Sequence, residues 1–171
     1  MKTIIAMTLT LLLLPTAAQA TRLPESIRQH LNRKYYAWKF SLIESEIHQF
    51  LKQRHARPDL ISGDFDGNGR TDYAVYIVYG KPPARKISVV VWLSTETGWK
   101  IHRLETHAAG EENLPSNSYL VLAKKGTRDY DYHRDRKFTY PHDSIFVGIF
   151  EKAGVSYVYG KGRFRQIVTS D

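Results

Sequence analysis

The chain contains no cysteine among its 171 residues. It therefore has no disulfide framework, no lipid anchor on an N-terminal cysteine and no thiol nucleophile. The sequence also lacks the H-E-x-x-H pattern of zinc proteases and the G-x-S-x-G turn of serine hydrolases. The folded protein must depend on its hydrophobic core, with a bound metal ion as the remaining way to reinforce it.

Long apolar runs are also missing, except at the N-terminus. Residues 1–20 contain Lys2, an apolar run over residues 4–14, Pro15 and the triplet A-Q-A at 18–20. This is the layout of a secretory signal peptide, and the run is shorter than the roughly 20 residues that span a bilayer. We expect cleavage after Ala20, a periplasmic or secreted protein, and no transmembrane span once the signal is removed; the alternative is a membrane-anchoring helix.

Acidic residues are outnumbered by basic ones. The chain has 25 Lys and Arg against 17 Asp and Glu, a formal net charge of +8, to which residues 1–20 contribute only Lys2. A positive field raises the local concentration of anionic partners, although salt screens it beyond roughly 8–10 Å. For an exported protein we expect an anionic envelope glycan or a protein partner, and no nucleic acid.

Two apolar periods divide the remaining chain. From Leu23 to His55 apolar residues recur at three- and four-residue steps, which is typical of helices, with a break near 37–41. After Pro58 the period becomes two, and short segments rich in β-branched and aromatic residues alternate with turn signals. These segments are 72–79, 86–93, 99–104, 118–124, 144–151, 155–159 and 163–168.

These periods predict one α+β domain. Connections between the segments are too short for crossover helices, so we expect antiparallel pairing. We predict an N-terminal helical segment over residues 21–57, following the signal peptide at 1–20. The β-rich part, 58–171, is predicted as an antiparallel meander of about seven strands in a partial-propeller-like sheet.

A nine-residue stretch, D-F-D-G-N-G-R-T-D, carries the strongest chemical signal. Oxygen-bearing side chains fall at positions 1, 3, 5 and 9, and a backbone carbonyl falls at position 7. This order suits Ca²⁺, which takes six to eight hard oxygen ligands, whereas Mg²⁺ prefers a tighter octahedron. Carboxylates held this close repel one another unless a cation lies between them. The predicted metal ligands are Asp64, Asp66, Asn68, the carbonyl of Arg70, and Asp72.

The same stretch suggests two other structures, an EF-hand and a plain hairpin turn. An EF-hand requires Glu at position 12, but Val75 stands there, so the site is not helix–loop–helix. A plain hairpin turn remains the alternative, because Asp-Gly and Asn-Gly are common turn pairs. We expect Gly67 and Gly69 to let the backbone curl around the ion, and we expect the ion to have a structural role.

Residues 61–75, I-S-G-D-F-D-G-N-G-R-T-D-Y-A-V, closely resemble an FG-GAP or VCBS-type repeat unit. The resemblance implies a loop that joins two strands and holds Ca²⁺. Family members with several copies form β-propellers used in adhesion and carbohydrate contact. Because this chain has one copy, the resemblance implies a single-repeat derivative in a small exported bacterial protein.

Histidine is the remaining source of acid–base chemistry. His102, His107, His133 and His142 are scattered along the sequence, so we expect surface or packing roles for them. His102 alternates with Ile101 along a predicted strand and is expected to face solvent. We therefore predict a non-enzymatic protein; a cell-envelope hydrolase with an unidentified histidine–carboxylate pair is the alternative.

Residues 128–140 form a candidate partner surface. Tyrosines there alternate with basic and acidic groups, and aromatic faces beside cations stack on sugars or meet polyanions. A hairpin whose tyrosines lean on the sheet is the structural alternative, and a rigid loop that inhibits an enzyme is a functional one. The residues assigned to the surface are Arg128, Tyr130, Tyr132, Arg134, Arg136 and Tyr140.

Overall fold

The computed structural model of the protein describes residues 22–52, 58–109 and 117–170. The predicted signal peptide lies outside the described residues, as does the end of the predicted helical segment at 53–57. None of the helices in these three ranges is long and apolar enough to cross a membrane.

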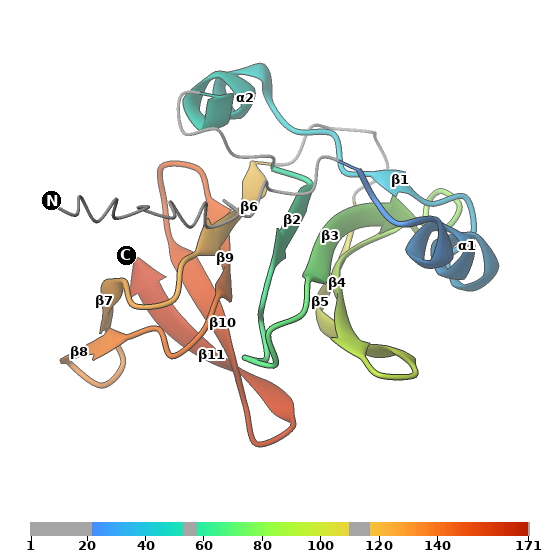
Figure 1. Cartoon of the computed structure of the whole chain (residues 1–171). Helices are drawn as coiled ribbons and strands as arrows, with labels where there is room; N and C mark the ends of the chain where they lie inside the picture. The colour runs from blue at the N-terminus through green and yellow to red at the C-terminus, as the bar shows by residue number, and fades with distance from the viewer. Residues whose placement is uncertain (1–21, 53–57, 110–116, 171) are drawn as a thin grey trace, which may run out of the picture.

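One sheet contains five strands, centred on the long hairpins of β3, β4 and β5 (Figure 1). β1 and β2 both pair with β3 in antiparallel fashion, β1 with its C-terminal half and β2 with its N-terminal half. The strands are β1 (Lys39–Phe40), β2 (Leu60–Gly63), β3 (Asp72–Tyr79), β4 (Lys86–Thr95) and β5 (Gly98–Ala108).

The second sheet has four antiparallel strands in the order β11-β10-β9-β6. Between β6 and β9 the chain forms a separate two-stranded hairpin, β7–β8, on the side of this sheet away from the first (Figure 1). The strands are β6 (Ser118–Ala123), β7 (Arg128–Asp131), β8 (Arg136–Thr139), β9 (Ser144–Ile149), β10 (Gly154–Gly160) and β11 (Arg163–Ser170).

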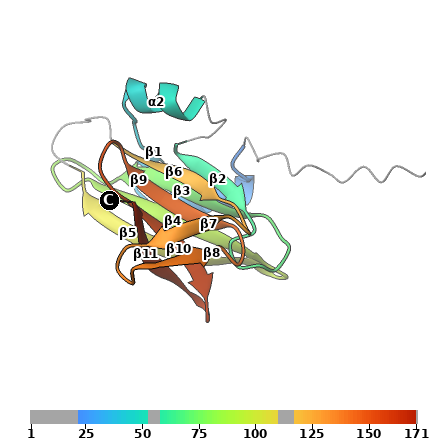
Figure 2. The same cartoon turned by 90° about the vertical axis from the view of Figure 1, so that its left-hand side faces the viewer.

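The main core lies between the two sheets. Alternate side chains along each strand point to opposite faces, so the inward residues of both sheets meet in one buried cluster. The Leu120 N–H donates to Pro58 O at 3.0 Å, which brings β6 beside the start of β2 (Figure 2). The buried members are Ile61, Phe65, Ala74, Tyr76, Val89, Val91, Leu93, Leu120, Ile145, Val147 and Tyr157.

Two short helices cover other faces. α1 (Glu25–Lys34) lies on the outer face of the five-stranded sheet, where Ile27 and Leu31 pack on β3 and β4 residues such as Trp92 (Figure 1). α2 (Ser45–Lys52) buries Ile47 and Leu51, and its cluster includes Tyr119 and Val121 of β6. Each helix therefore adds a small satellite core to the β structure.

The predicted fold class is wrong, because the described residues form a mostly β protein. α1 and α2 have 10 and 8 residues, and β1 separates them, so there is no continuous helical segment over 21–57. The helical period breaks at Ala37, whose φ of 52° turns the chain toward β1. The predicted meander is also wrong, since eleven described strands divide among three antiparallel sheets.

Candidate metal site

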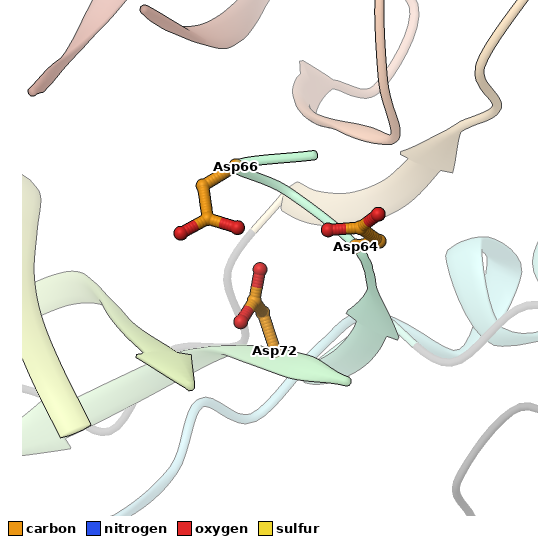
Figure 3. A group of neighbouring side chains, drawn as sticks. All are labelled: Asp64, Asp66 and Asp72. Carbon is orange, nitrogen blue, oxygen red and sulfur yellow. The ribbon is translucent and has the colours of Figure 1, made fainter. Parts of the chain in front are cut away.

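The acidic stretch forms the loop between β2, which ends at Gly63, and β3, which begins at Asp72. The carboxylates of Asp64, Asp66 and Asp72 converge on one space inside this loop (Figure 3). One oxygen from each lies within 4.8 Å of the others. The three side chains are therefore close enough to bind one cation together.

Two glycines and two side-chain turns shape the loop. Gly67 and Gly69 have φ values of 79° and 81°, in the left-handed region that glycine adopts without strain. The Asn68 N–H donates to Asp66 Oδ1 at 3.1 Å, and the Gly69 N–H donates to Asp64 Oδ2 at 3.0 Å. These bonds hold the side chains of Asp64 and Asp66 against the backbone of the loop.

Asp72 is fully buried and ties the loop to β4. Its Oδ2 accepts from the Phe65 N–H and its Oδ1 from the Ser94 N–H, both at 2.7 Å. Burial raises the pKa of Asp72 to about 7, and the charges of Asp66 and Asp64 act in the same direction. The two backbone donors oppose this effect on the pKa, because they favour the ionised carboxylate.

Asn68 and Arg70 lie in the same loop. Asn68 Oδ1 accepts from the Arg70 N–H at 2.8 Å, and Asn68 Nδ2 donates to Ser94 O at 2.8 Å. The Arg70 guanidinium is directed away, toward Glu96 at 3.8 Å on the surface. Only the backbone carbonyl of Arg70 is therefore suited to the ligand role that the sequence predicted.

The donor set fits a hard cation. It consists of carboxylate and amide oxygens, which suit Ca²⁺. Asp64 Oδ1 is buried and, among the described residues, has no hydrogen-bond partner. A buried oxygen without a partner is costly, and a cation would satisfy it. The residues present therefore fit a hard divalent cation, and calcium binding stays a prediction.

The second sheet supports the loop from outside. Asp143, just before β9, accepts from the Asp64 N–H at 3.3 Å through Oδ2 and from the Lys125 N–H at 3.0 Å through Oδ1. His142 lies against Gly67, with its Nδ1 3.3 Å from where a Cβ would stand. Neither contact was foreseen, because the residues are more than 70 positions away in the sequence.

Only some of the residues assigned to the 128–140 surface are exposed. Arg128, Arg134 and Arg136 are exposed on the β7–β8 hairpin, and Tyr132 is 51% exposed. Tyr130 is partly buried; its ring packs edge-on against Tyr132, and its hydroxyl donates to Asp135.

Tyr140 does not belong to that surface, because only 3% of it is exposed. Its hydroxyl contacts Asp129 Oδ2 at 2.5 Å and Ser156 Oγ at 2.6 Å. Burial, followed by the hydrogen bond to Asp129, raises the pKa of Tyr140 well above its usual range. Tyr140 therefore holds the hairpin to the second sheet.

The expectation that His102 faces solvent is corrected. Its ring packs edge-on against Tyr159 and Phe164 of the second sheet, with its Nε2 buried, while Ile101 is 39% exposed. Burial, with a contribution from Lys100, lowers the pKa of His102. The predicted alternation along β5 is present, but His102 faces the second sheet and Ile101 faces solvent, the reverse of the expectation.

The structure also brings together a histidine and a carboxylate that the sequence did not pair. Glu105 Oε2 contacts His107 Nε2 at 3.2 Å and accepts from the Tyr157 hydroxyl at 3.4 Å. A β-bulge shifts the β4–β5 register between Val89 and Val90 and turns Glu105 toward the second sheet. An alternating pattern carries no signal for such a bulge.

Comparison of the chain with protein-family models, curated proteins and solved structures finds no match to any of them.

Proposed function

We propose that this is an exported, non-enzymatic binding protein whose fold is stabilised by one calcium ion. The observation that carries the proposal is the convergence of Asp64, Asp66 and Asp72, with Asp64 Oδ1 buried and unpartnered among the described residues. The loop joins β2 and β3 of the first sheet, where Asp72 accepts from Ser94 of β4, and Asp143, just before β9 of the second sheet, accepts from the Asp64 N–H. Bound calcium would therefore stabilise the junction of both sheets.

The calcium ion has a structural role in this proposal. The Asp72 carboxylate accepts hydrogen bonds from two backbone N–H groups. The Asn68 side chain forms hydrogen bonds within the loop and donates to Ser94 O. These groups bind and orient, and none of them is placed to transfer a proton to a substrate. The binding partner we propose is an anionic envelope glycan, which the excess of basic residues favours.

The hydrolase alternative now has one candidate pair, Glu105 and His107. The pocket beside them is about 110 Å³, and the His107 side chain is 63% exposed. Glu105 Oε2 already contacts both His107 and Tyr157. The pocket volume is below the roughly 300–1,000 Å³ of typical ligand sites, and Glu105 is already engaged, so the binding function is favoured.

Thermal unfolding of the purified protein in EDTA, in millimolar Ca²⁺ and in millimolar Mg²⁺ tests the calcium proposal. A ligand at 100 times its dissociation constant adds about 2.7 kcal/mol to the free energy of unfolding, which corresponds to several degrees. We expect a rise in Tm with Ca²⁺ that exceeds the rise with Mg²⁺. Identical melting curves in all three conditions would refute the proposal.

A further inference from the structure

A groove of about 550 Å³ lies at the β10–β11 hairpin. It is separate from the acidic loop and was not among the candidate sites found in the sequence. Its lining combines cations with small or apolar residues, including Pro141, Val158, Gly160, Lys161, Arg163 and Arg165. We call it the β10–β11 groove.

The strand register explains why the groove is hollow and basic. Arg163 and Arg165 are two positions apart in β11, so their side chains share one face of the sheet. Their partners across the ladder are Gly160 and Val158. A Cβ at Gly160 would meet no atom within 4 Å, and Val158 is short and buried, so space remains beside both arginines.

The positive charge of the groove is not neutralised. Lys161, Arg163 and Arg165 are exposed, and within the described residues none of them forms an ion pair. No acidic residue is among those that line the groove in this part of the chain.

The acids of the neighbouring β7–β8 hairpin are already engaged. Asp129 accepts from Tyr140, and Asp135 accepts from Tyr130. Asp131 accepts from the Arg134 N–H at 3.2 Å. Among the described residues none of these carboxylates forms an ion pair with Lys161, Arg163 or Arg165, so the cationic donors of the groove are available to an external anion.

Turn chemistry does not account for the lysine at the tip. Lys161 and Gly162 have φ values of 51° and 80°, as in a two-residue hairpin turn that favours Asn or Asp at the first position. Lysine is an uncommon choice at that position. Its placement adds a third cation at the open end of the groove.

Two aromatic residues hold the hairpin from its opposite face, since Tyr159 and Phe164 alternate with the arginines and their partners along the two strands. Tyr159 and Phe164 pack against one another with ring centroids 5.0 Å apart. Lys100 Nζ donates to the Tyr159 hydroxyl at 3.0 Å, and His102 packs on both rings. Pro141 and Val158 supply the apolar part of the groove, and the arginine forks suit carboxylate and phosphate groups.

A lipid surface fits this site less well. Insertion into a bilayer requires exposed large apolar side chains, which on the described surface are Tyr36, Leu42, Ile101, Tyr132 and Ile149. None of these lines the groove. The concave shape and positive charge instead match a chain of acidic sugars.

We propose that the β10–β11 groove binds an anionic glycan, a sugar chain that carries carboxylate or phosphate groups. Arg163 and Arg165 pair with the acidic groups, and Lys161 adds charge at the open end. This inference rests on the proposed function as a glycan-binding protein, and it moves the principal contact from the 128–140 surface to β10 and β11.

Isothermal titration calorimetry with the purified protein, without added calcium, tests the groove. The probes are polygalacturonate for carboxylate, phosphomannan for phosphate, and neutral mannan as the uncharged control. We expect binding of at least one acidic probe and none of neutral mannan. Equal binding of neutral mannan, or no binding of either acidic probe, would overturn the proposal.

Charge-matched variants locate the site. Arg163→Gln and Arg165→Gln each remove one exposed charge from the groove, whereas Arg33→Gln removes one from α1 on another face. We expect a loss of affinity of about tenfold for each groove variant, as for a lost charged hydrogen bond, and less than twofold for Arg33→Gln. Equal losses in all three would show that only net charge attracts the glycan, and the groove would be rejected.

A charge-neutral variant gives a second, independent test. Gly160→Val fills the space beside Arg163 without changing any charge, and its Cβ meets nothing. We expect the variant to keep its Tm and lose glycan binding. Normal binding would overturn the groove while leaving the calcium proposal intact, because calcium binding is read separately from the melting curves.

Discussion

Asp143 Oδ2 accepts a hydrogen bond from the Asp64 N–H at 3.3 Å and thereby joins the start of the acidic loop to the second sheet. The contact depends on the residue just before the loop. A Cβ on Gly63 would lie 2.8 Å from Asp143 Oδ2 and 2.9 Å from Leu122 Cδ1. Glycine at 63 is therefore required by the packing of the two sheets, since its φ is not in the left-handed region.

We predict that Gly63→Ala destabilises the protein by about 1–3 kcal/mol, because the added methyl forces Asp143 and Leu122 to move. Gly160→Ala is the matched control, since its Cβ meets no atom within 4 Å. Urea unfolding followed by circular dichroism measures both variants. Equal midpoints for Gly63→Ala and the wild type would contradict the packing argument.

We predict that Asp66→Ala abolishes the rise in Tm with Ca²⁺, because it removes one of the three converging carboxylates. In EDTA we expect the variant to lose only about 1 kcal/mol of free energy of unfolding, because the Asp66 carboxylate makes exposed hydrogen bonds with Asn68. Glu96→Gln is the control: it removes an acid that contacts Arg70 outside the cluster. A full calcium response in Asp66→Ala would count against the site.

We predict that Asn68→Asp preserves the calcium response and strengthens it. A fourth carboxylate increases the attraction for a divalent cation, and the Oδ1 that the variant keeps can still accept from the Arg70 N–H. In EDTA the same variant is less stable than the wild type, since a further negative charge joins the cluster. Calcium titration of both proteins by calorimetry would show the change in affinity, and weaker binding by the variant would argue for a plain turn.

We predict that Tyr140→Phe destabilises the protein by about 1–3 kcal/mol. The hydroxyl lies in a buried place, and its removal takes away the donor to Asp129 Oδ2 and the contact with Ser156 Oγ, which keeps its bond to Thr169 Oγ1. Tyr132→Phe is the control, because Tyr132 is 51% exposed. Guanidinium unfolding of the two variants gives the comparison, and equal midpoints would show that the buried network contributes nothing.

We predict that the protein loses stability as pH rises above about 10. Burial is the main cause that raises the pKa of both Tyr140 and Tyr157. The second cause is the hydrogen bond to Asp129 for Tyr140 and the negative charge of Glu105 for Tyr157. The folded state therefore keeps protons that the unfolded chain releases above the usual tyrosine pKa, and unfolding becomes more favourable there. Urea midpoints between about pH 8 and 11, with absorbance at 295 nm, measure this, and Tyr140→Phe should flatten the slope.

Local patterns located many of the strands. The segments of period two coincide with β3, β4, β5, β6, β9, β10 and β11, because inward-facing residues of a half-buried strand must be apolar. The strands that were missed, β1, β2, β7 and β8, have two to four residues each. Such strands form because a neighbouring strand or sheet supplies their partners, and two to four residues do not show a period.

The sequence by itself determined the chemistry of the acidic loop, because its oxygen-bearing side chains and permissive glycines all fall within nine residues. Only the tertiary structure decided what surrounds that loop: Ser94 reaches it from β4, and Asp143 from the turn just before β9. The β10–β11 groove likewise depends on which residue lies opposite each arginine. The inward direction of Glu105 depends on a bulge between β4 and β5. Register and sheet packing are long-range properties, so no local pattern specifies them.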